Sequence, residues 1–382
     1  MDFELNREDT MIRDAIRDWV SKECTREVVG ELDEMGAFPE KLFKKLSKLG
    51  FCGMIVPEEY EGEGKNILGA CLVVEEIAFA YPALASCYIS PTFFGGAIIS
   101  ELGSDEQKNR ILSKIASKSN ITSLAFSEPE DPDAEVIKAA AKKQGDGFVI
   151  TGEKAYVSLA DQADLLILLA RTSDSEAGDD LTLFCLDGKA DGIDIKHSET
   201  MGYRGANTCR ISLTNVTAEP SDILGGEGQL GHGRRQLAVV NDLIQLAYAA
   251  SAVGMAQGAF EYALQHAKQR EQFGQVIGRF PAIGHMLTDG ACKIDAARLM
   301  VYRAAWMANK GRICSKEIFM ARCMGAEVAV KAAMDGLQVL GGYGYTMEYD
   351  IQRYIRDSVA LFSVGKSLDS LKEHIGASYG LA

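Results

Sequence analysis

The stretch RRQLAVVNDLIQLAYAASAVGMAQGAFEYALQHAKQ, residues 234–269, decides the interpretation of the fold. Its apolar side chains recur at helical spacing and predict one long helix that is apolar on more than one side. Such a helix lies in a bundle core or in a subunit interface. Residues 296–311 and 316–342 repeat the helical pattern and predict two more helices of the same bundle.

Two regions with different periodicities precede this bundle. Residues 1–120 are helical in pattern, as in REDTMIRDAIRDWVSKE (7–23). Residues 121–228 change to short β-branched or apolar runs that Gly, Asp or Asn bound, which is typical of strands. These runs are GFVITG (147–152), AYVSLA (155–160), DLLILLAR (164–171), LTLFCLD (181–187), IDIKH (193–197) and RISLTNV (210–216). The glycine-rich segment 223–233 is expected to be a flexible hinge.

The predicted fold class is therefore α+β, with helices and strands segregated along the chain. We expect an N-terminal α-helical domain (1–120), a middle β domain (121–228) and a C-terminal helical bundle domain (229–382). The strand-rich region favours a small antiparallel sandwich or barrel. This segregation argues against a Rossmann sheet, in which strands and helices alternate.

Length and composition exclude several classes of protein. At 382 residues the chain is too long for one ordinary core, and 47% apolar with 25% charged residues is a soluble globular profile. A net charge of −14 disfavours nonspecific binding to nucleic acid or anionic lipid. No apolar run approaches the roughly 20 residues of a membrane span. The acidic N-terminus, MDFELNREDT, is not a signal peptide, so a cytoplasmic location is expected.

Cysteine and histidine spacing argues against disulfides and metals. The nine cysteines form no CxxC pair, and their odd number fits poorly with a disulfide framework, which indicates a reducing compartment. The five histidines stand far apart and no HExxH motif is present. No metal site is predicted.

The stretch LFSVGKSLD (361–369) contains a Gly-Lys-Ser that looks like the end of a phosphate-binding loop. That loop needs an earlier glycine at position 360, where this chain has Ala360. It also needs a preceding strand, whereas residues 348–360 read as a helix. A turn followed by a last helix over 367–376 is the better prediction.

Several motifs in order along the chain resemble those of the acyl-CoA dehydrogenase family. They are SLAFSEPE (123–130), ITGEKAYVS (150–158), MGYRGANTCRISLTNV (201–216), REQFG (270–274), QVLGGYGY (338–345) and IQRYIRD (351–357). The resemblance implies a helical N-terminal domain, a β domain and a four-helix C-terminal bundle. It also implies FAD as cofactor, an acyl-CoA or other acyl thioester as substrate and, usually, a tetramer.

The resemblance places the flavin ring against two strand ends. Phe126 and Ser127 are expected to present backbone N–H groups and a hydroxyl to the flavin edge, and Tyr156 and Ser158 to cover one face and the polar rim. The family more often has Trp and Thr at the latter two positions. From the pattern alone, these residues equally fit an ordinary half-buried hairpin with aromatic packing.

The motif REQFG implies contacts to the rest of the cofactor. Arg270 can pair with a pyrophosphate, Gln272 can form a hydrogen bond and Phe273 can pack on a ring. In the family this segment reaches the FAD of a neighbouring subunit. Without the resemblance it is only a helix end with a charged residue.

The motif QVLGGYG implies contacts to the adenosine half of FAD. Gln338, Gly341 and Gly342 carry over from the family pattern, because paired glycines let a ligand approach the backbone closely. Taken alone, they fit a helix-terminating left-handed turn. Since the two sets of contacts come from different subunits, oligomerisation is expected to be required for cofactor binding.

The family's catalytic carboxylate is missing from its usual turn. Removal of a weakly acidic Cα proton needs a carboxylate base, and the family has a Glu eight residues after the Arg-Asp pair. Counting eight from Asp357 lands on Gly365, and no carboxylate lies between Asp357 and Asp369. In this turn Val364 is expected to contact the substrate and Ser367 the cofactor.

Some family members carry the base on the long helix, just before an Arg. Here Ile244 stands where that Glu would be and Gln245 where the Arg would be, so both base positions are non-acidic. Asp242 matches a family Asp that usually lies near the CoA. Gln245 and Asp242 are therefore assigned to substrate binding.

Three carboxylates are candidates for a relocated base. Asp133 replaces a substrate-facing Ser in the loop that follows SEP, and is assigned to substrate binding as well. Asp242 lies two residues from Ile244, on another helix face. Asp369 lies one turn beyond Gly365.

Three functions remain open from the sequence. The first is a flavoprotein that transfers hydrogen at Cα and Cβ of an acyl thioester, by dehydrogenation, enoyl reduction or non-oxidative elimination. The second is a catalytically impaired subunit of a hetero-oligomer with an active sister subunit. The third is an oxygenating member of the same scaffold. Electron-transfer flavoprotein is the implied redox partner of the first, in a homotetramer or a hetero-oligomer.

Overall fold

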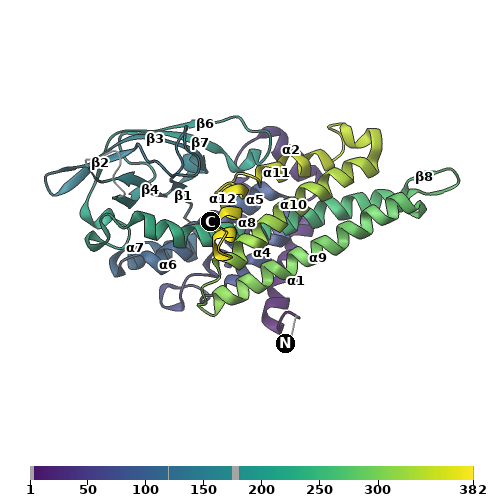
Figure 1. Cartoon of the computed structure of the whole chain (residues 1–382), viewed down its shortest axis with the longest axis horizontal. Coiled ribbons are helices and arrows are strands. Elements are labelled where there is room, and N and C mark those ends of the chain that lie inside the picture. The colour runs from purple at the N-terminus through teal and green to yellow at the C-terminus, as the bar shows by residue number, and fades with distance from the viewer. Residues whose placement is uncertain (1–3, 119, 174–179, 382) are drawn as a thin grey trace.

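The computed structural model describes residues 4–118, 120–173 and 180–381. Figure 1 shows the strands gathered at one end of an elongated molecule and the long helices at the other. This arrangement confirms the predicted α+β class with two helical parts and a central sheet. The domain boundaries at residues 120 and 228 stay a prediction.

The N-terminal part is helical, and its first two helices begin at side-chain caps. The Asn6 side chain accepts a hydrogen bond from the Asp9 N–H at 2.8 Å, and Thr25 accepts one from the Val28 N–H. A π-helical segment, Ser90–Ala97, continues one helix into the next. The helices are α1 (Arg7–Glu23), α2 (Arg26–Met35), α3 (Glu40–Ser47), α4 (Ile67–Ala80), α5 (Pro82–Ile89), α6 (Ile98–Leu102) and α7 (Asp105–Lys118).

The central sheet has seven strands in the order β1-β4-β2-β3-β7-β6, with β5 paired to β4. The strands are β1 (Thr122–Ala125), β2 (Ala140–Gln144), β3 (Gly147–Ser158), β4 (Leu165–Arg171), β5 (Leu181–Asp187), β6 (Ile193–His197) and β7 (Thr208–Ala218). The two runs at 147–152 and 155–160 belong to β3, which continues through both, so predicting two strands was wrong.

The purely antiparallel prediction was also wrong. Strand β1 runs parallel to β4, and β2 meets β4 in a parallel bridge, whereas the other pairs are antiparallel. The sequence analysis missed β1 because it has only four residues, and β2 because its AAKKQ sequence carries little strand preference. The segment 223–233 is bridged to the sheet through Ile223–Phe184 and His232–Leu181.

The C-terminal part is built around the predicted long helix, which is confirmed as α8 (Gly233–Gln269). Helix α8 packs against α4 on one side and α10 on another, so residues 244–256 are buried all round. The other helices are α9 (Pro281–Asn309), α10 (Ser315–Leu340), α11 (Ile351–Ala360) and α12 (Leu368–Ser378). A hairpin of β8 (Glu271–Gln272) and β9 (Gln275–Val276) follows α8.

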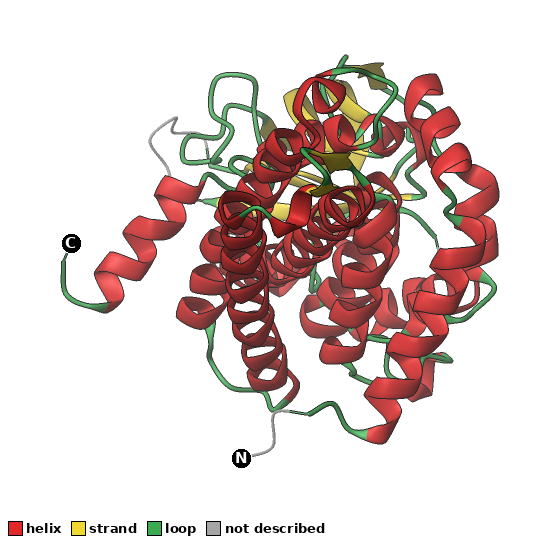
Figure 2. Cartoon of the chain, turned by 90° about the vertical axis from the view of Figure 1, so that its right-hand side faces the viewer, coloured by secondary structure: helices red, strands yellow, loops and turns green. Residues whose placement is uncertain are grey.

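The Gly-Lys-Ser segment is a turn, as predicted. Helix α11 precedes it, and Ser367 caps α12 by accepting a hydrogen bond from the Ser370 N–H at 3.3 Å. Helix α12 lies at the edge of the molecule and leads to the C-terminus (Figure 2).

Two helical stretches reach the length and mean hydropathy of a membrane span, which the sequence analysis had not recognised. They are Pro82–Leu102 and Gly233–Gln269. Within the protein, 94% and 67% of their most apolar windows are buried. These stretches therefore form the core of the fold.

Glycines set how closely α8 approaches α4. A Cβ atom added to Gly254 would lie 2.1 Å from the Glu75 carbonyl oxygen, and one added to Gly258 would lie 2.1 Å from that of Phe79. The two backbones therefore touch at these positions, where no larger residue fits without a shift of the helices.

We expect Gly254→Ala to destabilise the protein by about 1–3 kcal/mol, because the added methyl overpacks the α4–α8 contact. Gly228→Ala is the matched control, since a Cβ there meets no atom within 4 Å. Chemical denaturation of both variants measures the difference. Equal free energies of unfolding for the two variants would show that α4 and α8 accommodate the added methyl group without loss of stability.

Candidate active site

A cavity of about 500 Å³ lies where the three parts of the chain meet. We call it the inner cavity. It brings together the predicted ring-binding residues Phe126, Ser127, Tyr156 and Ser158 with Ile244, Val364 and Gly365. Phe94, from the π-helical segment, also lines it.

A β-bulge shapes the sheet side of the inner cavity. The β3–β7 register shifts between Lys154 and Val157, and Tyr156 has a positive φ of 57°. The bulge interrupts the ladder at Ala155 and Tyr156 and re-aims their backbone groups. Ala155 donates its N–H to the Ser127 carbonyl oxygen at 3.0 Å, which ties the bulge to the neighbouring segment.

A buried ion pair holds that same segment. The Lys154 ammonium lies 2.9 Å from the Glu128 carboxylate and donates a second hydrogen bond to the Phe126 carbonyl at 3.2 Å. Burial lowers the pKa of Lys154 to about 8, against the opposing effect of Glu128. Glu128 also accepts the N–H groups of Lys138 and Ala139. The pair therefore fixes the backbone at Phe126 and Ser127.

A second cavity of about 770 Å³ adjoins the first, and we call it the outer cavity. Phe126, Ile244 and Gly365 line both cavities. Asp133 and Asp242 line the outer cavity only, within the described parts of the chain.

Gly365 and Ile244, the two positions that the resemblance predicts for the base, meet in space. A Cβ atom added to Gly365 would lie 2.8 Å from Cγ2 of Ile244 and 3.1 Å from Nε2 of Gln245. Gly365 also has a positive φ of 77°, where a side chain is strained. The turn and helix α8 thus touch at these two positions. Gln245 is fully buried, and its Oε1 has no partner among the described residues.

The side chain of Asp133 stabilises the turn. Its two carboxylate oxygens accept hydrogen bonds from the N–H and the hydroxyl of Ser367, at 3.0 and 2.8 Å. Asp133 therefore joins the β-domain loop to the start of α12, and it does not line the inner cavity. Ser367 is engaged in the same contact and in capping α12.

The other two candidate bases lie away from the inner cavity as well. Asp242 accepts a hydrogen bond from the Ser315 hydroxyl at 2.6 Å, and burial raises the pKa of its carboxyl. Asp369 is exposed on α12. Among residues 4–118, 120–173 and 180–381, the inner cavity is lined by no carboxylate.

Arg322 of α10 is a functional residue that sequence reasoning missed. It is fully buried, and its Nη2 donates hydrogen bonds to the carbonyls of Leu361 and, at 3.4 Å, Val364. Burial lowers the pKa of Arg322 to about 10. The available signal was a lone basic residue in the apolar run FMARCMGAEVAV (319–330). This cation holds the turn that carries Gly365.

The remaining predicted cofactor residues lie elsewhere on the chain. Arg270, Gln272, Phe273, Gln338, Gly341 and Gly342 are all exposed. The Arg270 guanidinium lies 5.6 Å from the ring centre of Tyr343, so the two motifs are neighbours. Figure 1 places the β8 hairpin at the opposite end of the molecule from the sheet. One chain therefore does not bring these residues to the inner cavity.

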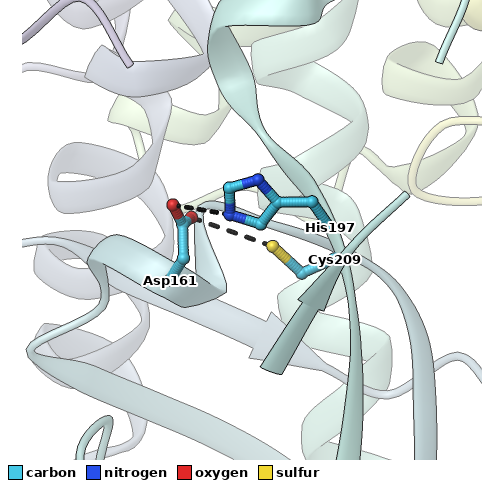
Figure 3. A group of neighbouring side chains, drawn as sticks. All are labelled: Asp161, His197 and Cys209. Atoms are coloured by element: carbon cyan, nitrogen blue, oxygen red, sulfur yellow. Dashed lines mark hydrogen bonds and ion pairs between the residues drawn. The ribbon is translucent and has the colours of Figure 1, made fainter. Parts of the chain in front are cut away.

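One group of potential metal ligands comes together that sequence spacing did not reveal (Figure 3). Asp161, His197 and Cys209 present ligand atoms within 4.8 Å of one another. The Asp161 carboxylate already accepts a hydrogen bond from the Asn207 side chain at 2.8 Å, and burial raises the pKa of Cys209 to about 11. Metal binding would require the thiolate. The group is best described as a hydrogen-bonded cluster in which Asp161, from the segment after β3, contacts His197 of β6 and Cys209 of β7.

A helical domain, a curled sheet and a helical bundle with a cavity at their junction define a class of FAD-dependent oxidoreductases. Sequence models of the N-terminal, middle and C-terminal domains of acyl-CoA dehydrogenase match residues 6–119, 123–216 and 242–364. The chain therefore belongs to the acyl-CoA dehydrogenase family.

Relatives of known name cover nearly the whole chain. A probable acyl-CoA dehydrogenase of Bacillus subtilis is 34% identical over 97% of both chains. A 3-(aryl)acrylate reductase of Clostridium sporogenes is 33% identical over 96% of this chain and 97% of its own. A subunit of the caffeyl-CoA reductase-Etf complex of Acetobacterium woodii is 31% identical over 92% and 93%.

The fold matches solved structures of the family. Butyryl-CoA dehydrogenase from Megasphaera elsdenii superposes with a TM-score of 0.95 at 26% identity, over 99% of this chain and 100% of that chain. The chain is thus an FAD-dependent oxidoreductase of the acyl-CoA dehydrogenase type, which acts on the CH–CH group of acyl thioesters.

The chemistry of the inner cavity fits the ring of FAD. Its walls combine the apolar Phe126 with the hydroxyl groups of Ser127, Ser158 and Thr208, and the bulge at Tyr156 opens the strand edge. A flat ring with a polar rim needs this combination of surfaces. Phe126, Ser127, Tyr156 and Ser158 would hold the ring, as the sequence predicts.

We expect Gly365→Ala to destabilise the protein by about 1–3 kcal/mol, through strain at a positive φ and the clash with Ile244. The double variant Gly365→Ala, Ile244→Ala removes the Cγ2 atom and should cost less than the sum of the single changes. Chemical denaturation of Gly365→Ala, Ile244→Ala and the double variant gives the coupling free energy between the two positions. Additive losses would contradict the contact between the two base positions.

Proposed function

We propose that this protein works as a reductase of α,β-unsaturated acyl thioesters. The observation that supports the proposal is the inner cavity, whose described lining holds hydroxyl groups and no carboxylate. Dehydrogenation needs a base that removes a weakly acidic Cα proton. Reduction needs a group that donates a proton at Cα, and a neutral hydroxyl can do so. When bound, FAD supplies the hydride that reaches Cβ.

The names of two relatives describe a reduction, which is the direction proposed for this chain. They are the 3-(aryl)acrylate reductase and the subunit of the caffeyl-CoA reductase-Etf complex. The second name also supports electron-transfer flavoprotein as the redox partner of this chain. We place the protein in the cytoplasm, where such a soluble electron carrier is available.

We infer a tetramer in which FAD is held by two chains. The exposed Arg270, Gln272 and Phe273 lie at the end of the molecule away from the inner cavity, and the Phe273 ring is 94% exposed. Aromatic residues such as Phe are enriched at protein–protein interfaces. A second copy of the chain would bring this hairpin to the cofactor, although a sister subunit could take the same place.

The direction of the reaction is tested anaerobically with matched thioesters. We expect crotonyl-CoA to reoxidise the dithionite-reduced, FAD-loaded protein, and butyryl-CoA to leave the oxidised protein unbleached. The visible flavin absorbance is the measurement. Rapid bleaching by butyryl-CoA would overturn the reductase proposal. A colourless protein that copurifies with a paralogue would instead support the impaired-subunit alternative.

Ile244→Glu restores a carboxylate at one family base position, because this side chain lines both cavities. We expect the variant to gain bleaching by butyryl-CoA of about 10²-fold over Ile244→Gln, its neutral isosteric control. Burial raises the pKa of a carboxyl at this site, so the gained rate should increase with pH. Equal rates for the two variants would mean that position 244 does not reach Cα.

A further inference from the structure

The space next to the empty base position is filled by an aromatic side chain of α8. Tyr248 follows Ile244 by one helical turn and lines the inner cavity. A Cβ atom added to Gly365 would lie 3.7 Å from Cδ2 of Tyr248. The phenol ring thus occupies the neighbourhood in which the family's carboxylate would act, and it carries a hydroxyl group.

We propose that Tyr248 is the proton donor of this site, an assignment that rests on the proposed reductase function. Hydride from the reduced cofactor forms the new Cβ–H bond, and the π electrons of the double bond move to an enolate. The enolate then forms the Cα–H bond as the Oη–H bond of Tyr248 breaks. Water returns a proton to the phenolate. The thioester gains two electrons and two hydrogens, and reduced FAD is the reductant.

The surroundings of Tyr248 keep its hydroxyl protonated. The side chain is only 3% exposed, and burial raises its pKa, while Ser86, Arg322 and Ser158 act in the opposite sense. At neutral pH the hydroxyl of Tyr248 is therefore protonated and can act as an acid. Its phenolate is scarce in the resting protein, so the same residue is a poor base for dehydrogenation.

Arg322 can stabilise the phenolate that the step leaves behind. Its buried Nε and Nη1 atoms have no hydrogen-bond partner among the described residues, and its charge lowers the pKa of Tyr248. A fixed cation near developing negative charge stabilises the transition state without reorganisation. The other titratable or charged groups of the inner cavity are Tyr156, Tyr203 and Arg356.

Tyr203 is the competing donor. It lines the same cavity, and its buried hydroxyl has no hydrogen-bond partner among the described residues. A Cβ atom on Gly365 would have Ile244, Gln245 and Tyr248 as its nearest neighbours, and Tyr203 is not among these three. The geometry therefore favours Tyr248, and Tyr203→Phe becomes the discriminating variant.

The first test measures crotonyl-CoA reduction by the FAD-loaded protein. Tyr248→Phe keeps the ring and removes the proton, so kcat should fall by about 10²–10⁴-fold with little change in KM. In the wild type, kcat should fall at alkaline pH as the phenol ionises, and this limb should vanish in the variant. Tyr262→Phe, on the same helix but outside the inner cavity, is the control that should keep full activity.

The second test does not depend on turnover. The near-ultraviolet absorbance of phenolate is followed while oxidised protein is titrated with base, with and without bound crotonyl-CoA. The thioester should shift one ionisation in the wild type and in Tyr203→Phe, and this shift should be absent from Tyr248→Phe. A hydroxyl that only supports packing would not respond to the thioester.

The outcomes separate the two proposals. A wild-type protein that does not reduce crotonyl-CoA overturns the reductase function. A wild-type protein that reduces it, with undiminished kcat in Tyr248→Phe or with the loss in Tyr203→Phe instead, overturns the assignment of Tyr248. Loss of kcat in Tyr248→Phe together with loss of the thioester-dependent ionisation establishes the donor.

Discussion

The buried contact between Arg322 and the turn after α11 is the interaction on which the site depends. Its guanidinium donates to the carbonyls of Leu361 and Val364, just before Gly365. Taking a cation out of water costs several kcal/mol, and only such hydrogen bonds offset the cost. Because the guanidinium is planar and rigid, it fixes the turn to α10, and α10 packs against α8. The meeting of Gly365, Ile244 and Tyr248 follows from that position.

The sheet side of the cavity is held by the same physical means. Lys154 is buried beside Glu128 and binds the Phe126 carbonyl, so a second desolvated cation positions the residues that would hold the flavin ring. Two elements that are far apart in the chain are each tied down by a buried charge. Walls that are held in place in this way are the condition for preorganised catalysis.

The positions predicted for a base have neutral neighbours. A Cβ atom at position 365 would crowd Ile244 and Gln245, and it would lie at ordinary contact distance from the ring of Tyr248. These three neighbours come from one helix, so α8 forms the neutral wall beside Gly365. A wall of neutral groups favours a reaction that delivers a proton over one that removes it. The carboxylate of Asp133 lies nearby, but it accepts hydrogen bonds from Ser367 and so stabilises the turn.

The sequence by itself determined the class of fold, the long helix α8, the turn before α12 and the neutral residues at the two positions predicted for the base. These features are local: helical periodicity and motif order are visible in consecutive residues. Only the tertiary structure decided that Gly365 touches Ile244, that Tyr248 lies beside them and that Asp133 clamps Ser367. It also decided the mixed pairing of the sheet and the burial of Arg322. These contacts join elements that are distant in sequence, and packing against other elements sets them, which residue spacing does not record.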